Sequence, residues 1–214
     1  MSFGVLASQT LVEMIKTGAI RADHAVLPAQ VQPASLDLRL GAVAYRVRAS
    51  FLAGHGNLVS DRVKDFEMHQ IDLTKGAVLE KGCVYVIPLM ESLNLPADVT
   101  AAANAKSSTG RLDLLTRTIT DGGVEFDRIP QGYKGPLYAE VCPRSFSVLA
   151  RAGQRLNQIR FRVGHAILSD ADLYTLHAQS TLVSGDAVIS EGLGFSVDLR
   201  PQIGDLVGYR AKPH

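Results

Sequence analysis

Strict alternation of apolar and polar residues is the feature that most constrains the fold of this chain. It occurs in Ser35-Leu36-Asp37-Leu38-Arg39-Leu40 and in parts of 44–47, 84–89 and 145–149. A period of two is typical of a strand with one buried face, because successive side chains point to opposite sides of a strand. Glycine and proline separate these runs, as they do in turns between strands. The sequence therefore predicts a mainly β chain.

Helical segments are expected to be few and short. Ser8 as N-cap, an apolar stripe after it and Gly18 beyond the last turn predict one helix near the amino terminus. Segments 51–70 and 165–192 are less regular, and each is expected to be a surface excursion with a short helix, the second opening at Asp170. Neither excursion contains a recognisable active-site pattern.

Charge and hydropathy exclude several classes of protein. The 22 basic and 21 acidic residues leave a net charge of +1, so no overall field draws the chain to nucleic acid or to a membrane. No apolar run approaches ~18 residues, and residues 1–9 lack the pattern of a signal peptide. We therefore expect a cytoplasmic protein without nucleic-acid or membrane partners, whose cysteines, Cys83 and Cys142, are reduced.

The strongest functional signal is the segment Lys106-Ser107-Ser108-Thr109-Gly110-Arg111. Its hydroxyls, backbone N–H groups and guanidinium can supply the donors that triphosphate oxygens need, and its glycine lets the backbone approach closely. Glu140, in a strand-like segment further along the chain, offers a proton acceptor. Together these residue types suggest chemistry on a nucleoside triphosphate. An ordinary turn or helix N-terminus, with Lys106 and Arg111 solvated, is the alternative.

Zinc-binding patterns are absent from the sequence. No histidine is followed two residues later by glutamate, and neither cysteine has a second cysteine three positions away. The His-x-Glu and Pro-Cys-x-x-Cys motifs of zinc-dependent nucleobase deaminases are therefore missing. The glycine fingerprints of P-loop and dinucleotide-binding proteins are missing too. We therefore expect nucleotide chemistry that uses no metal site of the protein.

A short internal repeat bears on the domain organisation. The run Ser35-Leu36-Asp37-Leu38-Arg39 is matched by Ser196-Val197-Asp198-Leu199-Arg200. Such a match can arise by chance in a β protein, or it can mark the start of a second, truncated copy of the domain. We expect one domain over residues 1–194 and an extension over 195–214.

Several sequence elements occur in a fixed order along roughly residues 5–165: the early helix, 32–41, 91–98, 106–111, Arg128-Ile129, 132–135, Glu140 and 155–159. In this order they resemble the motifs of dCTP deaminases of the dUTPase superfamily. The order makes the resemblance specific, because each element alone would be weak. The chain is most similar to the amino-terminal half of the longer, tandem form of these enzymes.

This resemblance implies a distorted jelly-roll of β strands, a dUTPase-like β-clip, with a short amino-terminal helix and small helical insertions. It also implies a homotrimer whose active sites lie between subunits. The implied activity is the hydrolytic removal of the cytosine 4-amino group of dCTP, which gives dUTP and ammonia without zinc. Mg²⁺ would be bound through the substrate triphosphate, which suits an ion that keeps waters and substrate oxygens as ligands.

The resemblance assigns roles to residues of the catalytic centre. Glu140 would be the general base that takes a proton from the attacking water and returns one to the departing amine. Arg111 would fix the carboxylate and stabilise developing charge, and Ser107 would bond near the reacting amino group or the water. The backbone carbonyl of Phe126 is a candidate for orienting that water. A buried structural carboxylate paired with an arginine is the alternative for Glu140.

The resemblance also implies a substrate-binding set. Lys106 and Ser108 would face the phosphates, Gln158 would reach the triphosphate, and Arg128 would line the nucleotide site. For Gln158 and Arg128, a contact between subunits of the trimer is the alternative.

Two positions depart from the family pattern. Pro130 stands where these enzymes usually have an aspartate, which in dUTPases activates water for phosphate hydrolysis, and Lys106 stands where they usually have arginine. The first change argues against diphosphate hydrolysis and removes an acceptor near the sugar, which neighbouring Asp127 could replace. The second change loses a bidentate fork. Three hypotheses follow: a dCTP deaminase, a dUTP diphosphatase or bifunctional relative, and a catalytically silent half that binds nucleotide and forms the trimer.

Overall fold

The computed structural model describes residues 3–164, 167–201, 204–209 and 212. Their contacts define two compact units: the first contains residues 3–164 and residue 212, and the second lies within residues 165–210. The expected domain boundary after residue 194 stays a prediction.

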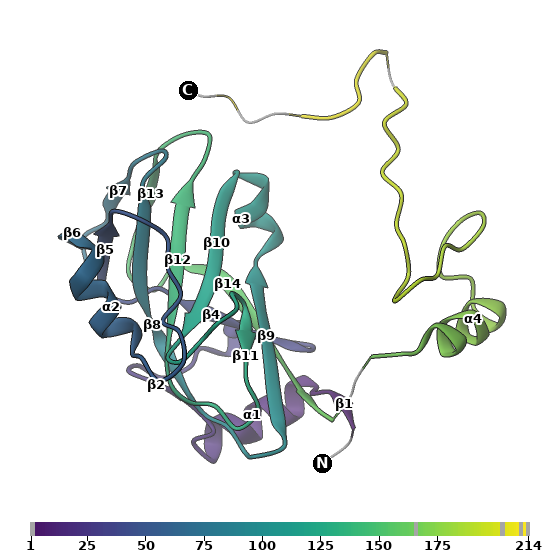
Figure 1. Ribbon diagram of the computed structural model, residues 1–214, viewed down its shortest axis with the longest axis horizontal. Coiled ribbons are helices and arrows are strands. Elements are labelled where there is room, and N and C mark those ends of the chain that lie inside the picture. Colours follow the sequence, from purple (N-terminus) through teal and green to yellow (C-terminus); the bar gives the residue numbers. More distant parts are fainter. Residues whose placement is uncertain (1–2, 165–166, 202–203, 210–211, 213–214) are drawn as a thin grey trace. The chain divides into compact units, whose positions relative to one another are not determined.

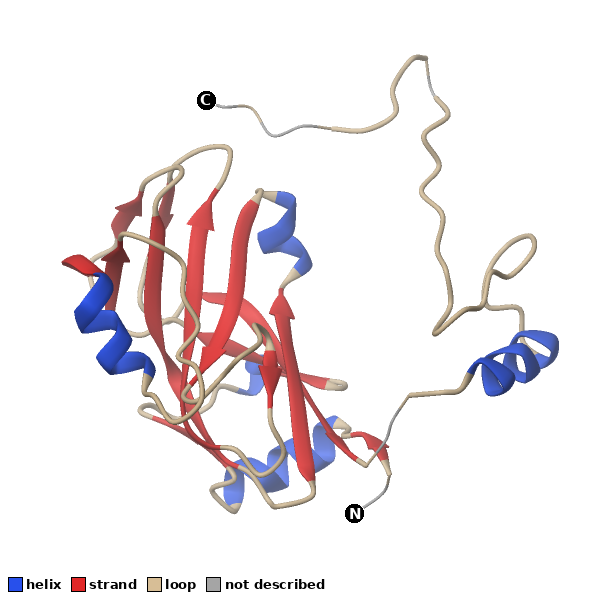
Figure 2. Ribbon diagram, viewed as in Figure 1, coloured by secondary structure: helices blue, strands red, loops and turns tan. Residues whose placement is uncertain are grey.

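Antiparallel strands dominate the first unit and form two six-stranded sheets and one two-stranded sheet (Figure 2). The strands are β1 (Gly4–Val5), β2 (Ile20–Ala22), β3 (Val31–Gln32), β4 (Ser35–Arg39), β5 (Val43–Val47), β6 (Glu67–Asp72), β7 (Ala77–Leu79), β8 (Val84–Asn94), β9 (Val99–Ala105), β10 (Leu114–Thr120), β11 (Arg128–Ile129), β12 (Lys134–Pro143), β13 (Val148–Ala150) and β14 (Arg155–Val163). The first sheet has the order β11-β9-β14-β4-β3, with β1 paired to β14. The second has the order β10-β12-β8-β5-β6, with β2 paired to β8, and β13 pairs with β7.

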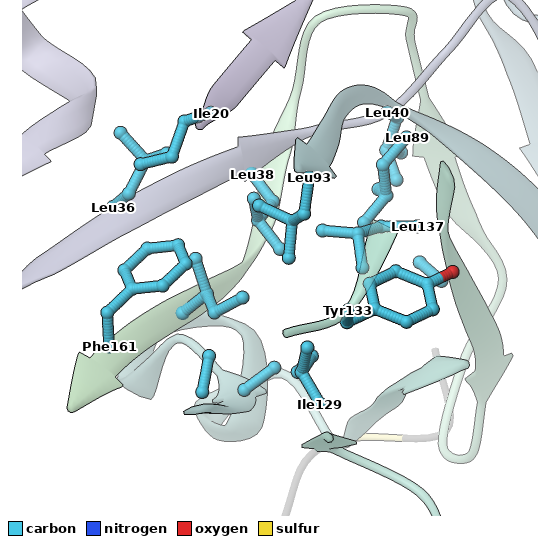
Figure 3. Close-up of a cluster of buried hydrophobic side chains, with 14 of the residues drawn as sticks. Ile20, Leu36, Leu38, Leu40, Leu89, Leu93, Ile129, Tyr133, Leu137 and Phe161 are labelled. Carbon is cyan, nitrogen blue, oxygen red and sulfur yellow. The ribbon is translucent and has the colours of Figure 1, made fainter. Parts of the chain in front are cut away.

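The two larger sheets enclose one apolar core (Figure 3). Leu36 and Leu38 of β4 and Phe161 of β14 come from the first sheet, whereas Leu93 of β8 and Leu137 of β12 come from the second. Each of these side chains is at most 3% exposed. Full burial of such a side chain stabilises the fold by about 1.5–3 kcal/mol, so the shared core holds the sheets together. The arrangement is that of a distorted jelly-roll, and the predicted mainly β fold class is confirmed.

The alternating segment from which the mainly β fold was predicted forms β4, and both faces of this strand are buried. Its leucines point into the core as expected, but Ser35, Asp37 and Arg39 are also buried. Arg39 is covered because its Nε donates to Glu91 Oε1 at 2.7 Å, and its Nη1 and Nη2 donate to backbone carbonyls. Alternation therefore locates this strand, whereas the burial of its polar face depends on ion pairs made across the fold.

The predicted amino-terminal helix is present as α1 (Ser8–Lys16). Its N-cap is Ala7, and no side chain caps it. The expectation that Ser8 caps the helix is wrong, because Ser8 is the first helical residue and its N–H donates to the Pro33 carbonyl at 2.9 Å.

The remaining helical elements are η1 (Pro28–Gln30) and the helices labelled α2 (Val59–Phe66), α3 (Ser107–Arg111) and α4 (Asp170–Gln179) in Figure 1. Of these, α2 and α4 lie in the two excursions expected to carry a short helix. The second of them begins at Asp170, as the sequence predicts. The small helical insertions are therefore confirmed.

The segment 48–66, which contains α2, packs on the face of the second sheet that points away from the main core. Phe51, Val59 and Val63 form a second apolar cluster with residues of β5, β8, β10 and β12. The segment is also tied to the loop after β10, because the N–H of Gly54 donates to the Gly123 carbonyl at 2.9 Å. The segment 48–66 therefore covers part of the outer face of the second sheet.

The second unit contains α4 and irregular segments. Residues 196–200, which match β4 in sequence and are all described, form no strand, and Val197 and Leu199 are 81% and 70% exposed. In the predicted extension, residues 202–203, 210–211 and 213–214 lie outside the described residues.

Two further expectations concern the whole chain. Cys83 and Cys142 form no disulfide bond in the structure, and their reduced state stays a prediction. Among the helices that the structure describes, none is long and apolar enough to cross a membrane.

Candidate functional site

Glu140 lies directly opposite Arg117 in the antiparallel pairing of β12 with β10. The Nε and Nη2 atoms of Arg117 donate to Glu140 Oε1 at 3.1 and 2.5 Å. The glutamate is only 2% exposed, and its Oε2 is buried without a hydrogen-bond partner. An unsatisfied buried carboxylate oxygen is costly, and a catalytic role is one of the explanations for such an atom. One oxygen of this carboxylate is thus anchored, and the other is free to accept a proton.

The pair lies on the outer face of the second sheet, beneath the segment 48–66. Ser50 of this segment accepts a hydrogen bond from Arg117 Nη2 at 3.1 Å. On the other side, the Arg117 guanidinium carbon lies 3.6 Å from the centroid of the Phe126 ring, a close cation–π contact. Sequence analysis missed Arg117 and Ser50, because no motif contains them. Strand register brings Arg117 to Glu140, and the segment 48–66 brings Ser50 to Arg117.

The loop that carries Phe126 is fixed by Asp127, which adopts a left-handed backbone with φ 62°. Its N–H donates to the Thr118 carbonyl at 2.9 Å, and its Oδ1 accepts from the Thr118 N–H at 2.7 Å. Its own carbonyl accepts from the Ala103 N–H at 2.8 Å. Burial raises the pKa of Asp127, and the nearby Glu140 carboxylate adds to that rise. The backbone of Phe126 therefore has a defined position beside the Arg117–Glu140 pair.

Residues 107–111 form the short helix α3, and Lys106 is its N-cap. Ser107, Ser108 and Arg111 are exposed within one chain. Over the described residues, no hydrogen bond or ion pair joins Ser107 or Arg111 to Glu140. Their predicted catalytic roles stay predictions.

A second polar cluster forms around Asp37 on β4, which is 1% exposed. Its Oδ2 accepts from Lys106 Nζ and lies 3.4 Å from Arg155 Nη1, and its Oδ1 has no partner. Gln158 lies opposite Asp37 across β14 and β4, and accepts from Ser35 Oγ at 3.3 Å. The fold therefore brings together two of the predicted phosphate ligands, Lys106 and Gln158. The sequence stretches containing Asp37 and Arg155 helped to reveal the family resemblance, but neither residue was predicted to belong to the site.

Arg128 is exposed on β11 and forms an ion pair with Glu125 at 2.9 Å. It lines a pocket of about 220 Å³ together with His55, Pro130 and residues of the loop after β10. Val124 and two glycines complete a largely apolar wall there. The predicted place of Arg128 in a nucleotide site stays a prediction, and the pocket beside it has room for part of a nucleoside.

Within the part of the chain that the structure describes, no group of three or more His, Cys, Asp or Glu side chains could hold a metal ion. Two groups of charged side chains with an unpartnered buried carboxylate oxygen are present instead: the Arg117–Glu140 pair on the second sheet and the cluster around Asp37 on the first. Both are arrangements of carboxylate with arginine or lysine, suited to proton transfer and to binding anions.

Known proteins resemble this chain in sequence and in structure. The family model of the 2′-deoxycytidine 5′-triphosphate deaminase N-terminal domain matches residues 2–165, and that of the C-terminal domain matches residues 169–214. The "dCTP deaminase, dUMP-forming" of Methanoculleus marisnigri is 29% identical over 164 residues, which cover 73% of this chain and 79% of that protein.

A solved structure is also similar. The crystal structure of 2′-deoxycytidine 5′-triphosphate deaminase from Agrobacterium tumefaciens matches 94% of this chain with a TM-score of 0.87 and 51% sequence identity. The chain spans 60% of the length of that protein. With family models covering both of its parts, the chain belongs to the dCTP deaminase family.

Proposed function

We propose that this chain catalyses the hydrolytic deamination of dCTP to dUTP and ammonia, with Glu140 as the general base. The observation that carries the proposal is the carboxylate of Glu140, buried with Oε1 anchored by Arg117 and Oε2 free. Because the chain belongs to the dCTP deaminase family, the cytosine ring is the group on which this carboxylate would act.

In the proposed reaction, water adds to C4 of the cytosine ring as Oε2 of Glu140 removes its proton. The same carboxyl group then returns a proton to the 4-amino group, the C4–N bond breaks, and ammonia leaves. Positioned proton transfer of this kind contributes about 10²- to 10⁴-fold to a rate. Ser107 would bond to the water or the amino group, Arg111 would stabilise the charge that develops, and the Phe126 carbonyl would orient the water.

The triphosphate would bind near the cluster around Asp37. Lys106, Ser108 and Gln158 are the proposed ligands, and the partly exposed guanidinium of Arg155 adds a second cation at this place. Mg²⁺ would be held mainly by phosphate oxygens and water, and the unpartnered Oδ1 of Asp37 is an oxygen suited to such an ion or its water shell. The ion would neutralise phosphate charge, and no zinc is required.

The assembly and location belong to the same proposal. A homotrimer with active sites between subunits would let the exposed Ser107 and Arg111 of one chain meet Glu140 of a neighbour. Arg128 would line the nucleoside pocket beside Pro130. Nucleotide chemistry of this kind is expected in the cytoplasm.

A second candidate function is a bifunctional enzyme that converts dCTP to dUMP. It is favoured by the name of the Methanoculleus relative, which is dUMP-forming. Against it stands Pro130, because a proline cannot activate water for attack on a phosphate as an aspartate would. We therefore place deamination without phosphate hydrolysis first.

The test is to incubate the protein with dCTP and Mg²⁺ and to measure ammonia, diphosphate and the nucleotides formed. Ammonia and dUTP in equal amounts are expected. Diphosphate and dUMP would instead support the bifunctional enzyme. Binding of dCTP without turnover would overturn the proposal in favour of a catalytically silent half.

A further inference from the structure

Arg117 contacts Glu140 but belongs to none of the motifs that carry the family resemblance. We propose that Arg117 is a positioning residue that holds the carboxylate of Glu140 so that Oε2 faces the substrate. This inference rests on the proposed deamination. It means that the general base, Glu140, is oriented by a side chain of its own chain.

The two hydrogen bonds converge on one oxygen. Both Nε and Nη2 of Arg117 donate to Oε1 of Glu140, whereas a side-by-side arginine–carboxylate pair would use both oxygens. Oε2 is left without a partner although it is buried. The ion pair therefore makes the two carboxylate oxygens different. Oε1 is held by Arg117, and Oε2 is left to act on the substrate.

Arg117 is itself held from two sides. The Phe126 ring lies against the guanidinium at 3.6 Å, and Ser50 accepts from Nη2 at 3.1 Å. These contacts come from the loop before β11 and from the segment 48–66, whose apolar residues are packed on the second sheet. A guanidinium fixed in this way loses little freedom when the substrate binds, which is what preorganisation requires.

Phe126 also links the base to the water. Its ring stacks on the Arg117 guanidinium, while its backbone carbonyl is the proposed hydrogen-bond acceptor for the attacking water. The next residue, Asp127, holds the loop in a left-handed conformation that non-glycine residues seldom adopt. One rigid loop would thus align both the carboxylate and the water.

The competing explanation is that Arg117 only stabilises the fold by pairing with a buried carboxylate. Such a role predicts a loss of stability with kcat and KM almost unchanged in the folded fraction. Positioning predicts a fall in kcat with KM little changed, because the substrate still binds but meets a misaligned base. A misplacement of about 1 Å can cost ~10²-fold in rate.

The experiment compares Arg117→Lys, Arg117→Ala and Phe126→Leu with the parent protein, using ammonia release from dCTP with Mg²⁺. The matched control is Arg46→Ala, because Arg46 lies on the same sheet, is 29% exposed against 30% for Arg117, and pairs with Glu80 at 3.0 Å. Thermal unfolding of each variant shows whether it is folded. Phe126→Leu keeps the ion pair and so covers the case in which Arg117→Ala does not fold.

We expect kcat to fall ~10²-fold in Arg117→Ala with KM within about threefold, smaller falls in Arg117→Lys and Phe126→Leu, and no change in Arg46→Ala. Guanidinium ion at non-denaturing concentration should partly restore Arg117→Ala, because the vacated site is partly exposed. Parent kcat in folded Arg117→Ala, or in both Arg117→Lys and Phe126→Leu, would overturn the inference.

A crystal structure of an Arg117 variant separates this inference from the proposed function. We expect the Glu140 carboxylate to turn from its position in the parent or to occupy more than one orientation. An unchanged carboxylate would overturn the positioning role even if the parent released no ammonia, whereas an inactive parent would by itself refute only the deamination.

Discussion

Replacing Asp37 by asparagine tests whether the cluster on the first sheet is held by charge. Asp37 is 1% exposed, while the side chains of Lys106 and Arg155 that meet its Oδ2 are 27% and 35% exposed. Removing one partner of a fully buried pair costs about 3–5 kcal/mol, and an exposed pair is worth about 0–1 kcal/mol. Because both cations keep about a third of their exposure, we expect Asp37→Asn to lose about 2 kcal/mol of unfolding free energy.

Thermal unfolding measures this loss directly. A change of 1 kcal/mol shifts Tm by about 2–4 °C in a domain of this size, so a fall of about 4–8 °C is expected. Double-mutant cycles with Lys106→Met and Arg155→Met should give the larger coupling energy for Lys106, which makes the closer contact. Arg160→Met is the control, because Arg160 lies exposed on the same strand as Arg155. An unchanged Tm in Asp37→Asn, or coupling energies near zero, would refute the reasoning.

Two further predictions concern buried groups near the site. Tyr133→Phe should lower the free energy of unfolding in urea by about 1–3 kcal/mol. The lost hydroxyl accepts from the Asp121 N–H at 3.1 Å and donates to the Pro136 carbonyl at 2.7 Å. An unchanged unfolding midpoint would contradict this prediction. Burial raises the pKa of Asp127 above its ordinary 3.8, so the parent loses stability as pH rises from that value through the raised pKa. Asp127→Asn lacks this loss and can keep the bond to Thr118, so its stability relative to the parent should rise over that pH range; a relative decline would show the sign to be wrong.

Local patterns in the sequence predict the parts of this fold that depend on local structure. The apolar stripe after Ser8 locates α1, and the alternation from Ser35 locates β4. The same alternation at 196–200 forms no strand, because a strand needs partners and an apolar surface to cover, and Val197 and Leu199 remain exposed. Pattern alone therefore does not distinguish a strand with partners from one without them.

The candidate site depends on contacts between distant parts of the chain. Glu140 was found through the order of family motifs, but Arg117 could not be, because its place opposite Glu140 follows from the register of β10 with β12. Ser50 reaches the same pair from an excursion that contains no active-site pattern. In sequence, Asp37 is an ordinary polar residue of an alternating strand, and only the antiparallel pairing of β4 with β14 brings Arg155 to it. Register and ion pairing of this kind are set by the whole fold.

The central claim is that Glu140 accepts the proton during deamination of dCTP, and its most direct test is the rate of ammonia release by Glu140→Gln at saturating dCTP and Mg²⁺. Glutamine keeps an Oε1 to accept from Arg117, so the fold should persist while the basic Oε2 is lost. We predict a rate about 10²- to 10⁴-fold below that of the parent, with unfolding still cooperative. Ammonia release at the parent rate would contradict the claim.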